Sequence, residues 1–303
     1  MFKNKRILVT GGTGFIGSNL VRRLISEGAN VFILAREKSN FSRINDVLEG
    51  VRIRISDLSD ASRLKKIVQE IKPDGIFHLG AITIMSGVMV EPEKVMQINF
   101  SGTKNLVEAL SQTNYDFFIN TGSFSEIESQ DDYSKSKLLS TEFSSDYAKK
   151  HGKSIVTLRL FTPYGPFIQK GRLIYNVLTN AMKGEDIKMT SPNIARDFIF
   201  VDDIVDLYFE SARMAGGNKG EIFNAGTGVK TTLKEVADIA LKITGSKSRV
   251  LWGVLPAVSY DSDKIQADMT RTFSKLGWKP KIDFETGLKK TYKWLRENIS
   301  FYQ

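Results

Sequence analysis

Thr10-Gly11-Gly12-Thr13-Gly14-Phe15-Ile16-Gly17 is a glycine-rich segment near the start of the chain, and it indicates the fold. An apolar run, Arg6-Ile7-Leu8-Val9, precedes it, and residues 18–25, which follow it, have apolar side chains at helical spacing. This order predicts a buried strand, a tight turn and a helix, which is the opening of a βαβ unit that binds a dinucleotide. An ordinary glycine turn is the alternative, and the strand before it and the helix after it argue against that alternative.

The three glycines of the motif have separate expected roles. Gly11 permits the turn, Gly14 lets the backbone approach a pyrophosphate, and Gly17 lets helix and strand pack closely. The N-terminus of the following helix then points at the anion.

The composition is that of a folded globular protein, with 41% apolar and 25% charged residues among 303. This length is enough for one large α/β domain or for a domain with a smaller lobe. The chain has no cysteine, which excludes disulfides and thiolate chemistry, and its two histidines, His78 and His151, are far apart in sequence. We therefore expect no metal site.

The net charge of +9 raises the question of nucleic acid binding. The basic residues are interleaved with acids along the whole chain, and no basic block with aromatic residues occurs, so we expect no nucleic acid partner. A basic surface also suits anionic small ligands. Because residues 1–6 lead into the first strand without a signal segment and no later run is long enough to span a bilayer, we expect a cytoplasmic protein without a membrane partner.

The second expected strand, residues 31–34, bears on the choice of cofactor. Proteins specific for NAD usually place an acid at the end of this strand, where it binds the ribose hydroxyls. Here Arg36 takes that place, and Lys38 and Ser39 follow it, so the turn suits a phosphate dianion. The pattern favours NADP(H). NAD(H) stays possible if Arg36 and Lys38 are only solvated loop charges.

The next elements carry further candidate cofactor contacts. After a strand at residues 51–55, Asp57 either caps the helix at 61–71 or reaches the adenine ring, and the two roles are compatible. The fourth expected strand, residues 76–81, ends in the small residues Gly80 and Ala81, which allow a cofactor to lie close to the backbone. We expect His78 in this strand to be a packing residue.

The helix expected over residues 92–110 contains Asn99, which is either exposed or holds something by hydrogen bonds. The fifth strand, residues 117–121, leads to Ser123. Because the carboxyl ends of parallel strands form the ligand crevice, the hydroxyls of Thr121 and Ser123 are placed to meet a substrate.

Tyr133 and Lys137 are four residues apart and project from one face of a helix that runs to about residue 150. A nearby ammonium group lowers the pKa of a tyrosine, which otherwise titrates near 10, and lets it exchange a proton at neutral pH. This spacing also arises by chance, but after a dinucleotide loop and a hydroxyl-bearing strand end it indicates chemistry.

Together these motifs resemble the extended short-chain dehydrogenase/reductase family, the group that acts on nucleotide sugars. Residues 10–17 resemble its cofactor loop, Asp57-Leu58 its adenine contact, residues 78–81 its fourth-strand motif and Asn99 its helix asparagine. Ser123, Tyr133 and Lys137 are similar to its catalytic triad. Four later segments look like its substrate-domain motifs: residues 158–166, 196–203, 223–228 and 276–280.

The resemblance covers essentially the whole chain and implies its architecture. We expect an α/β fold with a Rossmann-type doubly wound parallel sheet and a smaller C-terminal α/β substrate lobe. Residues 1–160 are the expected NADP-binding domain, and residues 161–303 mainly form the substrate lobe, partly interleaved with the first domain. The family also suggests a homodimer formed through the helices that bear Asn99 and Tyr133, whereas apolar residues such as Leu106 and Leu110 could equally be internal core.

The resemblance also implies a set of site residues. Ser123, Tyr133 and Lys137 are the expected catalytic residues, and Ser123, Thr162 and Arg196 the expected substrate contacts. For Arg196 the chosen role is binding the substrate diphosphate, and an ion pair with Asp202 or Asp203 is the alternative. The expected cofactor contacts are Gly11, Gly14, Phe15, Ile16, Gly17, Arg36, Ser39, Asp57, Leu58, Leu79, Gly80, Ala81, Asn99, Thr121, Tyr133, Lys137, Phe161 and Pro163.

Within the family, the chain looks most like the reductases of 4-keto-6-deoxyhexose nucleotides, such as the CDP-abequose and CDP-paratose synthases and the TDP-4-keto-6-deoxyglucose reductases. This rests on residues 118–124, the short spacing from Ser123 to Tyr133, and Arg36. Dehydratases carry an acidic pair after the catalytic serine or threonine, which is missing from Ser123-Phe124-Ser125. C4 epimerases usually have an acid in place of Arg36, and many relatives have asparagine in place of Thr162.

The expected reaction is hydride transfer from NADPH to the C4 carbonyl of the substrate. Tyr133 would supply the proton, Lys137 would tune Tyr133 and hold the nicotinamide ribose, and Ser123 would bind the same oxygen. Two alternatives stay open: a nucleotide-sugar C4 epimerase with the same residues, and a non-catalytic NADP-binding redox sensor, which would not need the tyrosine.

Overall fold

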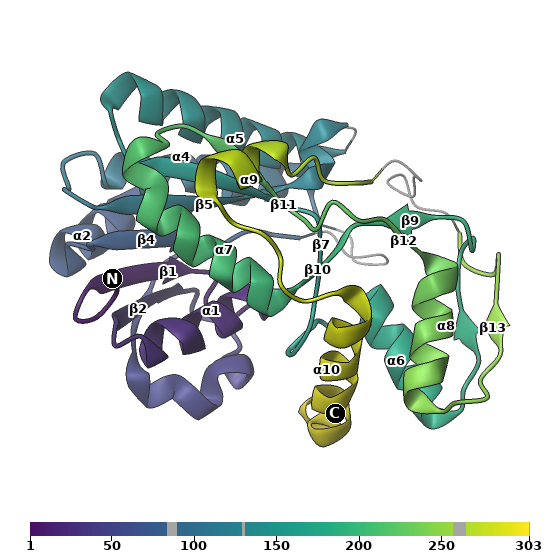
Figure 1. Ribbon diagram of the computed structural model, residues 1–303. Helices are drawn as coiled ribbons and strands as arrows, with labels where there is room; N and C mark the ends of the chain where they lie inside the picture. The colour runs from purple at the N-terminus through teal and green to yellow at the C-terminus, as the bar shows by residue number, and fades with distance from the viewer. Residues whose placement is uncertain (84–89, 129–130, 257–264, 303) are drawn as a thin grey trace. The chain divides into compact units, whose positions relative to one another are not determined.

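The computed structural model describes residues 1–83, 90–128, 131–256 and 265–302. The chain divides into two compact units (Figure 1). The first consists of Met1–Leu160 and Val205–Phe223, and the second of Phe161–Ile204 and Asn224–Gln303.

The first unit is built on a sheet of seven strands. Their bounds are β1 Arg6–Thr10, β2 Asn30–Ala35, β3 Val51–Ile55, β4 Gly75–His78, β5 Phe117–Ser123, β6 Ile155–Leu160 and β11 Ile222–Ala225. The order is β11-β6-β5-β4-β1-β2-β3, and the five pairs from β6 to β3 are all parallel. The order reverses between β1 and β4, and in such sheets ligands bind beyond the carboxyl ends of the strands at that point. The predicted Rossmann-type sheet is confirmed.

Helices cover both faces of this sheet (Figure 1). Their bounds are α1 Phe15–Ser26, η1 Ser42–Gly50, α2 Ala61–Ile71, α3 Pro92–Met96, η2 Gln97–Ser101, α4 Gly102–Ala109, η3 Phe124–Ile127, α5 Asp132–His151, α7 Val201–Met214 and η4 Ala215–Gly217.

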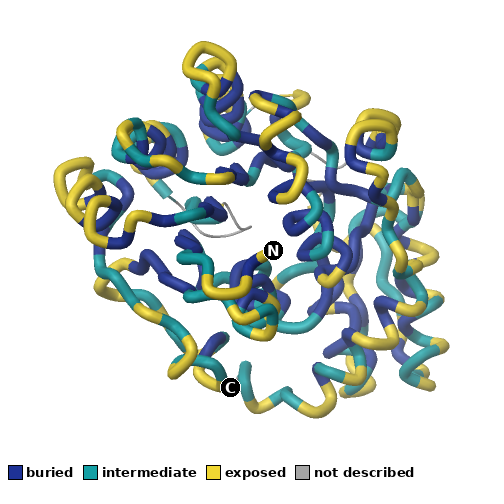
Figure 2. Tube along the Cα trace, turned by 60° about the vertical axis from the view of Figure 1, so that its left-hand side comes forward, coloured by how far each residue is buried: buried dark blue, intermediate teal, exposed yellow. Residues whose placement is uncertain are grey.

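Alternating side chains of the strands pack against the two helix layers. Ile76 and Phe118 belong to the core shared with α2, α4 and α5, and Leu106 and Leu110 also lie in this core, each 0% exposed. Phe77, the next residue on β4, packs against Phe209 of α7 on the opposite face. Figure 2 shows the strands as buried segments and the exposed residues on the outer sides of the helices. Of the two roles considered for Leu106 and Leu110, internal core is the observed one.

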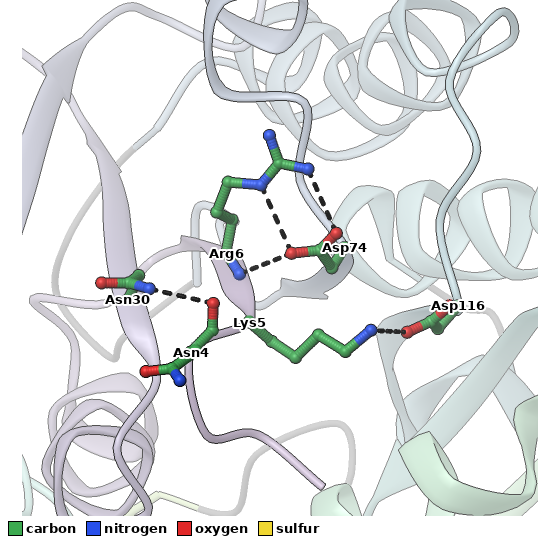
Figure 3. A network of polar contacts seen from close by, with 6 residues as sticks. All are labelled: Asn4, Lys5, Arg6, Asn30, Asp74 and Asp116. Atoms are coloured by element: carbon green, nitrogen blue, oxygen red, sulfur yellow. Dashed lines mark hydrogen bonds and ion pairs between the residues drawn. The ribbon is translucent and has the colours of Figure 1, made fainter.

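Polar contacts join the amino-terminal ends of the strands (Figure 3). Asp74, just before β4, accepts hydrogen bonds from the backbone N–H of Arg6 at 2.7 Å and from its guanidinium at 3.2 and 3.3 Å. Lys5 forms an ion pair with Asp116, before β5, at 3.0 Å. These contacts fix three neighbouring strands at the edge opposite to the glycine loop.

Three local features differ from the sequence prediction. The fourth strand ends at His78, because the N–H of Gly80 donates to the Thr10 hydroxyl instead of continuing the backbone ladder. The helix expected over 92–110 is interrupted by the π-helical segment η2, and such segments are frequent at functional sites. The cap of α2 is Asp60, which accepts from the N–H of Arg63, and not Asp57.

The second unit has short strands and several helices. Their bounds are β7 Thr162–Tyr164, α6 Leu173–Lys183, β8 Ile187–Lys188, β9 Ala195–Arg196, β10 Phe198–Phe200, β12 Thr231–Thr232, α8 Leu233–Thr244, β13 Val250–Leu251, α9 Thr270–Leu276, α10 Phe284–Glu297 and η5 Ile299–Tyr302. The pairs β7–β10 and β8–β13 are parallel, whereas β9–β12 is antiparallel. A cluster of aromatic rings around Tyr164, Phe198 and Phe284 forms part of the core.

Within the described ranges, no helix is both long and apolar enough to cross a membrane.

Candidate active site

The glycine loop lies directly against the segment that follows β4. Gly11 has φ +70°, and a Cβ at this position would lie 2.7 Å from the carbonyl of Leu79 and 2.8 Å from the nitrogen of Gly80. A Cβ on Gly17 would lie 2.1 Å from the carbonyl oxygen of Gly11. Both positions therefore require glycine, because neighbouring backbone atoms occupy the space that a side chain would need.

The N-terminus of α1 follows this loop and has the character of an anion site. The helix begins at Phe15 after the N-cap Gly14, which provides no side-chain cap, and its first turn contains no acid. The N–H groups of such a turn favour an anion such as a pyrophosphate. Phe15 and Ile16 lie in this first turn and are half-buried. The cradle fits the dinucleotide that the motif predicts.

A tight turn at the end of β2 carries the residues that are expected to distinguish the cofactors. The N–H of Arg36 donates to the Ser39 hydroxyl at 2.9 Å, and the N–H of Ser39 donates to the Arg36 carbonyl at 3.0 Å. Arg36 and Lys38 are exposed. Because Ser39 accepts through its oxygen, its own proton remains for a ligand acceptor.

The expected adenine contacts, Asp57 and Leu58, follow β3. The carboxylate of Asp57 accepts from the N–H and the hydroxyl of Ser59, at 2.9 and 2.8 Å. The side chain of Leu58 is 8% exposed and packs at the positions of Gly80 and Gly102, where a Cβ would touch it. The Leu58 side chain is thus used in packing, and a contact of this residue with the adenine ring stays a prediction.

His78 lies at the centre of a buried hydrogen-bond network. Its Nδ1 is 2.7 Å from the Thr10 hydroxyl, which already accepts from the N–H of Gly80 and so donates to His78. Its Nε2 is 2.9 Å from the Thr103 hydroxyl, which donates to the carbonyl of Asn99. Burial, followed by the charge of Lys137, lowers the pKa of His78 to about 3. His78 is a neutral packing residue, as the sequence predicted.

Asn99 holds protein groups in place. Its Oδ1 accepts from the N–H of Ile82 at 2.7 Å, and its Nδ2 donates to the Ile82 carbonyl and to the Ser136 hydroxyl, both at 3.0 Å. The side chain is 1% exposed. Asn99 fixes the segment that follows Leu79, Gly80 and Ala81 and ties it to α5, and its contact with a cofactor stays a prediction.

Thr121 and Ser123 lie at the carboxyl end of β5, as predicted. The Thr121 hydroxyl is 2.5 Å from that of Tyr208, a buried residue on α7. Thr121 is thus engaged with protein, and its contact with a nicotinamide stays a prediction. Ser123 is 8% exposed, and its Oγ accepts from the N–H of Ser125 at 3.3 Å and lies 2.9 Å from the Ser125 hydroxyl. Either hydroxyl can be the donor in this pair, so donation by Ser123 to a ligand requires that Ser125 donate to Ser123.

Tyr133 and Lys137 lie one turn apart near the start of α5, as the spacing predicted. Tyr133 is half-buried and Lys137 is 4% exposed. Burial lowers the pKa of the Lys137 ammonium group, and the negative charge of Glu126 opposes this shift. No hydrogen bond joins this ammonium group to any residue in the described part of the chain, which leaves its N–H donors for a bound ligand.

Glu126 is the residue at this site that the sequence analysis missed. Its Oε1 accepts from the N–H of Ser123 at 2.6 Å and from the Thr141 hydroxyl at 3.1 Å, and its Oε2 pairs with Arg159 at 3.2 Å. The carboxylate is fully buried. A signal was present, because Ser123 and Glu126 have the spacing of a capping box, which the structure forms here.

The remaining predicted residues belong to the second unit. Phe161 is buried, and Thr162 and Pro163 lie in β7. The Thr162 hydroxyl is buried and has no hydrogen-bond partner among the residues described, which is compatible with a ligand contact. Arg196 ends β9 and is half-buried, while the Asp203 carboxylate accepts from the N–H groups of Lys281 and Ile282.

Asp197, beside Arg196, was not singled out from the sequence. Its carboxylate accepts from the N–H groups of Thr227, Gly228 and Ala267 and from the Thr227 hydroxyl, at 2.7 to 3.0 Å. Asp197 is 0% exposed and joins three segments of the second unit. It holds the backbone from which Arg196 projects.

A search of the described residues finds no group of three acidic or histidine side chains that could hold a metal ion.

Comparison with known proteins agrees with this geometry. Residues 7–226 match the model of the NAD dependent epimerase/dehydratase family. The chain is 30% identical to the CDP-abequose synthase of Salmonella muenchen, over 95% of this chain and 97% of that protein. It is 29% identical to a probable dTDP-glucose 4,6-dehydratase of Sinorhizobium fredii, over 98% and 95% of the two chains.

A solved structure shows the same fold. The UDP-glucose 4-epimerase of Thermotoga maritima, determined with UDP-glucose, superposes with a TM-score of 0.88 at 25% identity and covers 97% of this chain and 99% of its own. The predicted resemblance and the predicted class of NAD(P)-dependent oxidoreductase are confirmed at the level of the family. The chain belongs to the NAD-dependent epimerase/dehydratase family of extended short-chain dehydrogenases/reductases.

Proposed function

We propose that this protein reduces the C4 keto group of a nucleotide-diphosphate-4-keto-6-deoxyhexose with NADPH. The observation that carries the proposal is the arrangement around the carboxyl end of β5. The Ser123 hydroxyl lies there, and the adjoining helix carries a tyrosine and a buried ammonium group one turn apart.

The similarity to a CDP-abequose synthase supports a sugar nucleotide as substrate. The departures from the epimerase and dehydratase patterns support reduction as the net reaction. Ser123 is followed by Phe124 and Ser125 and not by an acidic pair, and Glu126, the nearest acid, points away from a ligand because protein groups surround it.

Each residue then has a defined role. NADPH, when bound, supplies a hydride to C4. Ser123 donates a hydrogen bond to the carbonyl oxygen and stabilises the negative charge that develops on it. Tyr133 gives its phenolic proton to that oxygen. Lys137 provides a positive charge beside the phenol and N–H donors for the nicotinamide ribose.

The turn after β2 supports the choice of NADPH. An exposed guanidinium and a serine hydroxyl with an available proton match the geometry and charge of a 2′-phosphate. Arg36 directly follows β2, in the place where NAD-specific proteins usually hold the ribose hydroxyls with an acid, and the acid Glu37 comes one residue later.

The experiment that tests the proposal is nicotinamide oxidation by the purified protein over a panel of CDP-, TDP- and GDP-4-keto-6-deoxyhexoses, with NADPH and NADH in parallel. Stoichiometric consumption, faster with NADPH, is the expected result. The absence of oxidation with every member of the panel would refute the reductase.

A C4 epimerase is the second candidate, because the superposed Thermotoga maritima structure is an epimerase. An epimerase returns the hydride to the opposite face and consumes no cofactor. Interconversion of 4-hydroxy sugar nucleotides without net oxidation of NADPH would establish this reaction in place of reduction.

A further inference from the structure

A buried charged cluster lies directly behind the expected catalytic residues of the first unit. We define it as Glu126, Lys137 and Arg159, which come from η3, α5 and β6. Glu126 is the only acid among the three, and its side chain is 0% exposed, against 20% for Arg159. A buried carboxylate is costly unless cations and donors surround it, so its presence here calls for a function.

Glu126 joins the two elements that carry the expected chemistry. Its Oε1 accepts from the backbone N–H of Ser123 and from Thr141, which lies one helical turn beyond Lys137 on α5. There is no space for another residue at position 122, because a Cβ on Gly122 would lie 2.7 Å from this oxygen. The strand end and the helix are thus held together through one carboxylate oxygen.

Glu126 also acts on the charge of Lys137. Burial lowers the pKa of Lys137, and the negative charge of Glu126 is what opposes the fall. Burial raises the pKa of Glu126, whereas Arg159 and Lys137 oppose that rise. Glu126 is therefore the group through which the charges of this cluster are balanced.

We propose that Glu126 is a positioning residue, whose carboxylate holds Ser123 against α5 and places a buried negative charge behind the catalytic residues. The inference rests on the proposed function, since it assigns Glu126 a part in the proton transfer by Tyr133. It goes beyond that function because Glu126 itself touches no substrate.

The groups that face this cluster define the expected pH response. Arg159 lies on β6, Lys137 on α5, and His78, whose pKa Lys137 lowers, lies on β4. Burial lowers the pKa of His78 to about 3, so the response near neutral pH and above comes from the cluster and from Tyr133, the proton donor beside Lys137.

The test uses Glu126→Gln, which keeps the shape of the side chain and an oxygen for Ser123 but removes the charge. The high-pH limb of kcat for NADPH oxidation should move to lower pH by about one unit, because Lys137 loses its counter-charge. Arg159→Gln should move the same limb in the same direction, to lower pH, because Arg159 is a cation that keeps the Glu126 carboxylate ionised. Glu128→Gln, an exposed acid two residues further on, is the matched control and should leave the limb in place.

A second readout needs no substrate. Glu126→Gln should lower the urea midpoint of unfolding in the wild type, and by less when Lys137→Met is also present, since the part of the loss that depends on Lys137 is then already absent while the pair with Arg159 remains. Equal losses in both backgrounds, or a pH limb that does not move in either variant, would overturn the inference. If the effects of Glu126→Gln and Lys137→Met on the urea midpoint depend on each other but the wild type oxidises no NADPH with any substrate of the panel, the proposed function would be refuted. The link between Glu126 and Lys137 would still be established.

Discussion

The substitution Gly11→Ala tests whether the glycine loop is dictated by backbone contact. Two costs add at this position. The first is the left-handed conformation, φ +70°, which is unfavourable by roughly 1–2 kcal/mol for a residue with a Cβ. The second is the overlap of the new Cβ with the Leu79 carbonyl and the Gly80 nitrogen. Both are backbone atoms, which cannot move aside as the end of a flexible side chain can. Overpacking of this kind costs about 1–3 kcal/mol.

Gly152→Ala is the matched control. Gly152 ends α5 with φ +65°, and a Cβ there would have no neighbour within 4 Å, so this variant carries the conformational cost alone. Urea unfolding followed by circular dichroism should show a loss of about 2–5 kcal/mol for Gly11→Ala and about 1 kcal/mol for Gly152→Ala. Titration with NADPH, followed by nicotinamide fluorescence, should show an affinity at least about tenfold weaker for Gly11→Ala and unchanged for the control. Equal losses for the two variants, with NADPH affinity retained, would refute the argument from backbone contact.

Three further predictions follow from named contacts. Between about pH 6.5 and 3 the unfolded chain binds a proton at His78, whereas the folded chain does not. The free energy of unfolding should therefore fall by roughly 3 kcal/mol from pH 7 to pH 4.5 because of His78, and by less in His78→Gln. An identical fall in the variant would exclude His78 as its source. Although burial opposes it, pairing with Arg6 lowers the pKa of Asp74. Asp74→Asn should therefore lower the free energy of unfolding, measured in urea, by about 1 kcal/mol at neutral pH, and the difference from wild type should shrink as pH falls below about 4. A difference that does not depend on pH would contradict the pairing. Arg36→Ala should raise the KM for NADPH about tenfold and leave that for NADH unchanged, and equal effects on both would show that Arg36 does not bind the phosphate.

The architecture could be predicted from the sequence because it depends on local patterns. The glycine loop, the apolar strands and the helix after each strand fix the order of elements, and right-handed crossovers then fix the sheet. The positions of Ser123, Tyr133 and Lys137 follow from the same patterns, since a strand end and a four-residue spacing are local signals.

The features that could not be predicted depend on partners far apart in the chain. The Asn99 amide is used by Ile82 and Ser136, which no spacing identifies. Asp57 and Asp60 compete for the same cap, and only the geometry shows that Asp60 provides it. The expected end of the fourth strand was wrong because a side chain, Thr10, replaces the ladder partner of Gly80.

The role of Glu126 at the candidate site also depends on contacts with residues far away in the chain. The capping-box spacing to Ser123 can be read from the sequence, but the contacts with Thr141 and Arg159 come from elements 15 and 33 residues away. A buried acid among cations is a property of the packed structure.

We propose that Tyr133 provides the proton for reduction of a 4-keto sugar nucleotide, and NADPH oxidation by Tyr133→Phe beside the wild type tests this role. With a 4-keto-6-deoxyhexose nucleotide that the wild type reduces, the variant should lose roughly 10²–10⁴-fold in kcat, while its NADPH affinity, measured by fluorescence, stays within about threefold. A variant that keeps wild-type turnover would contradict the account.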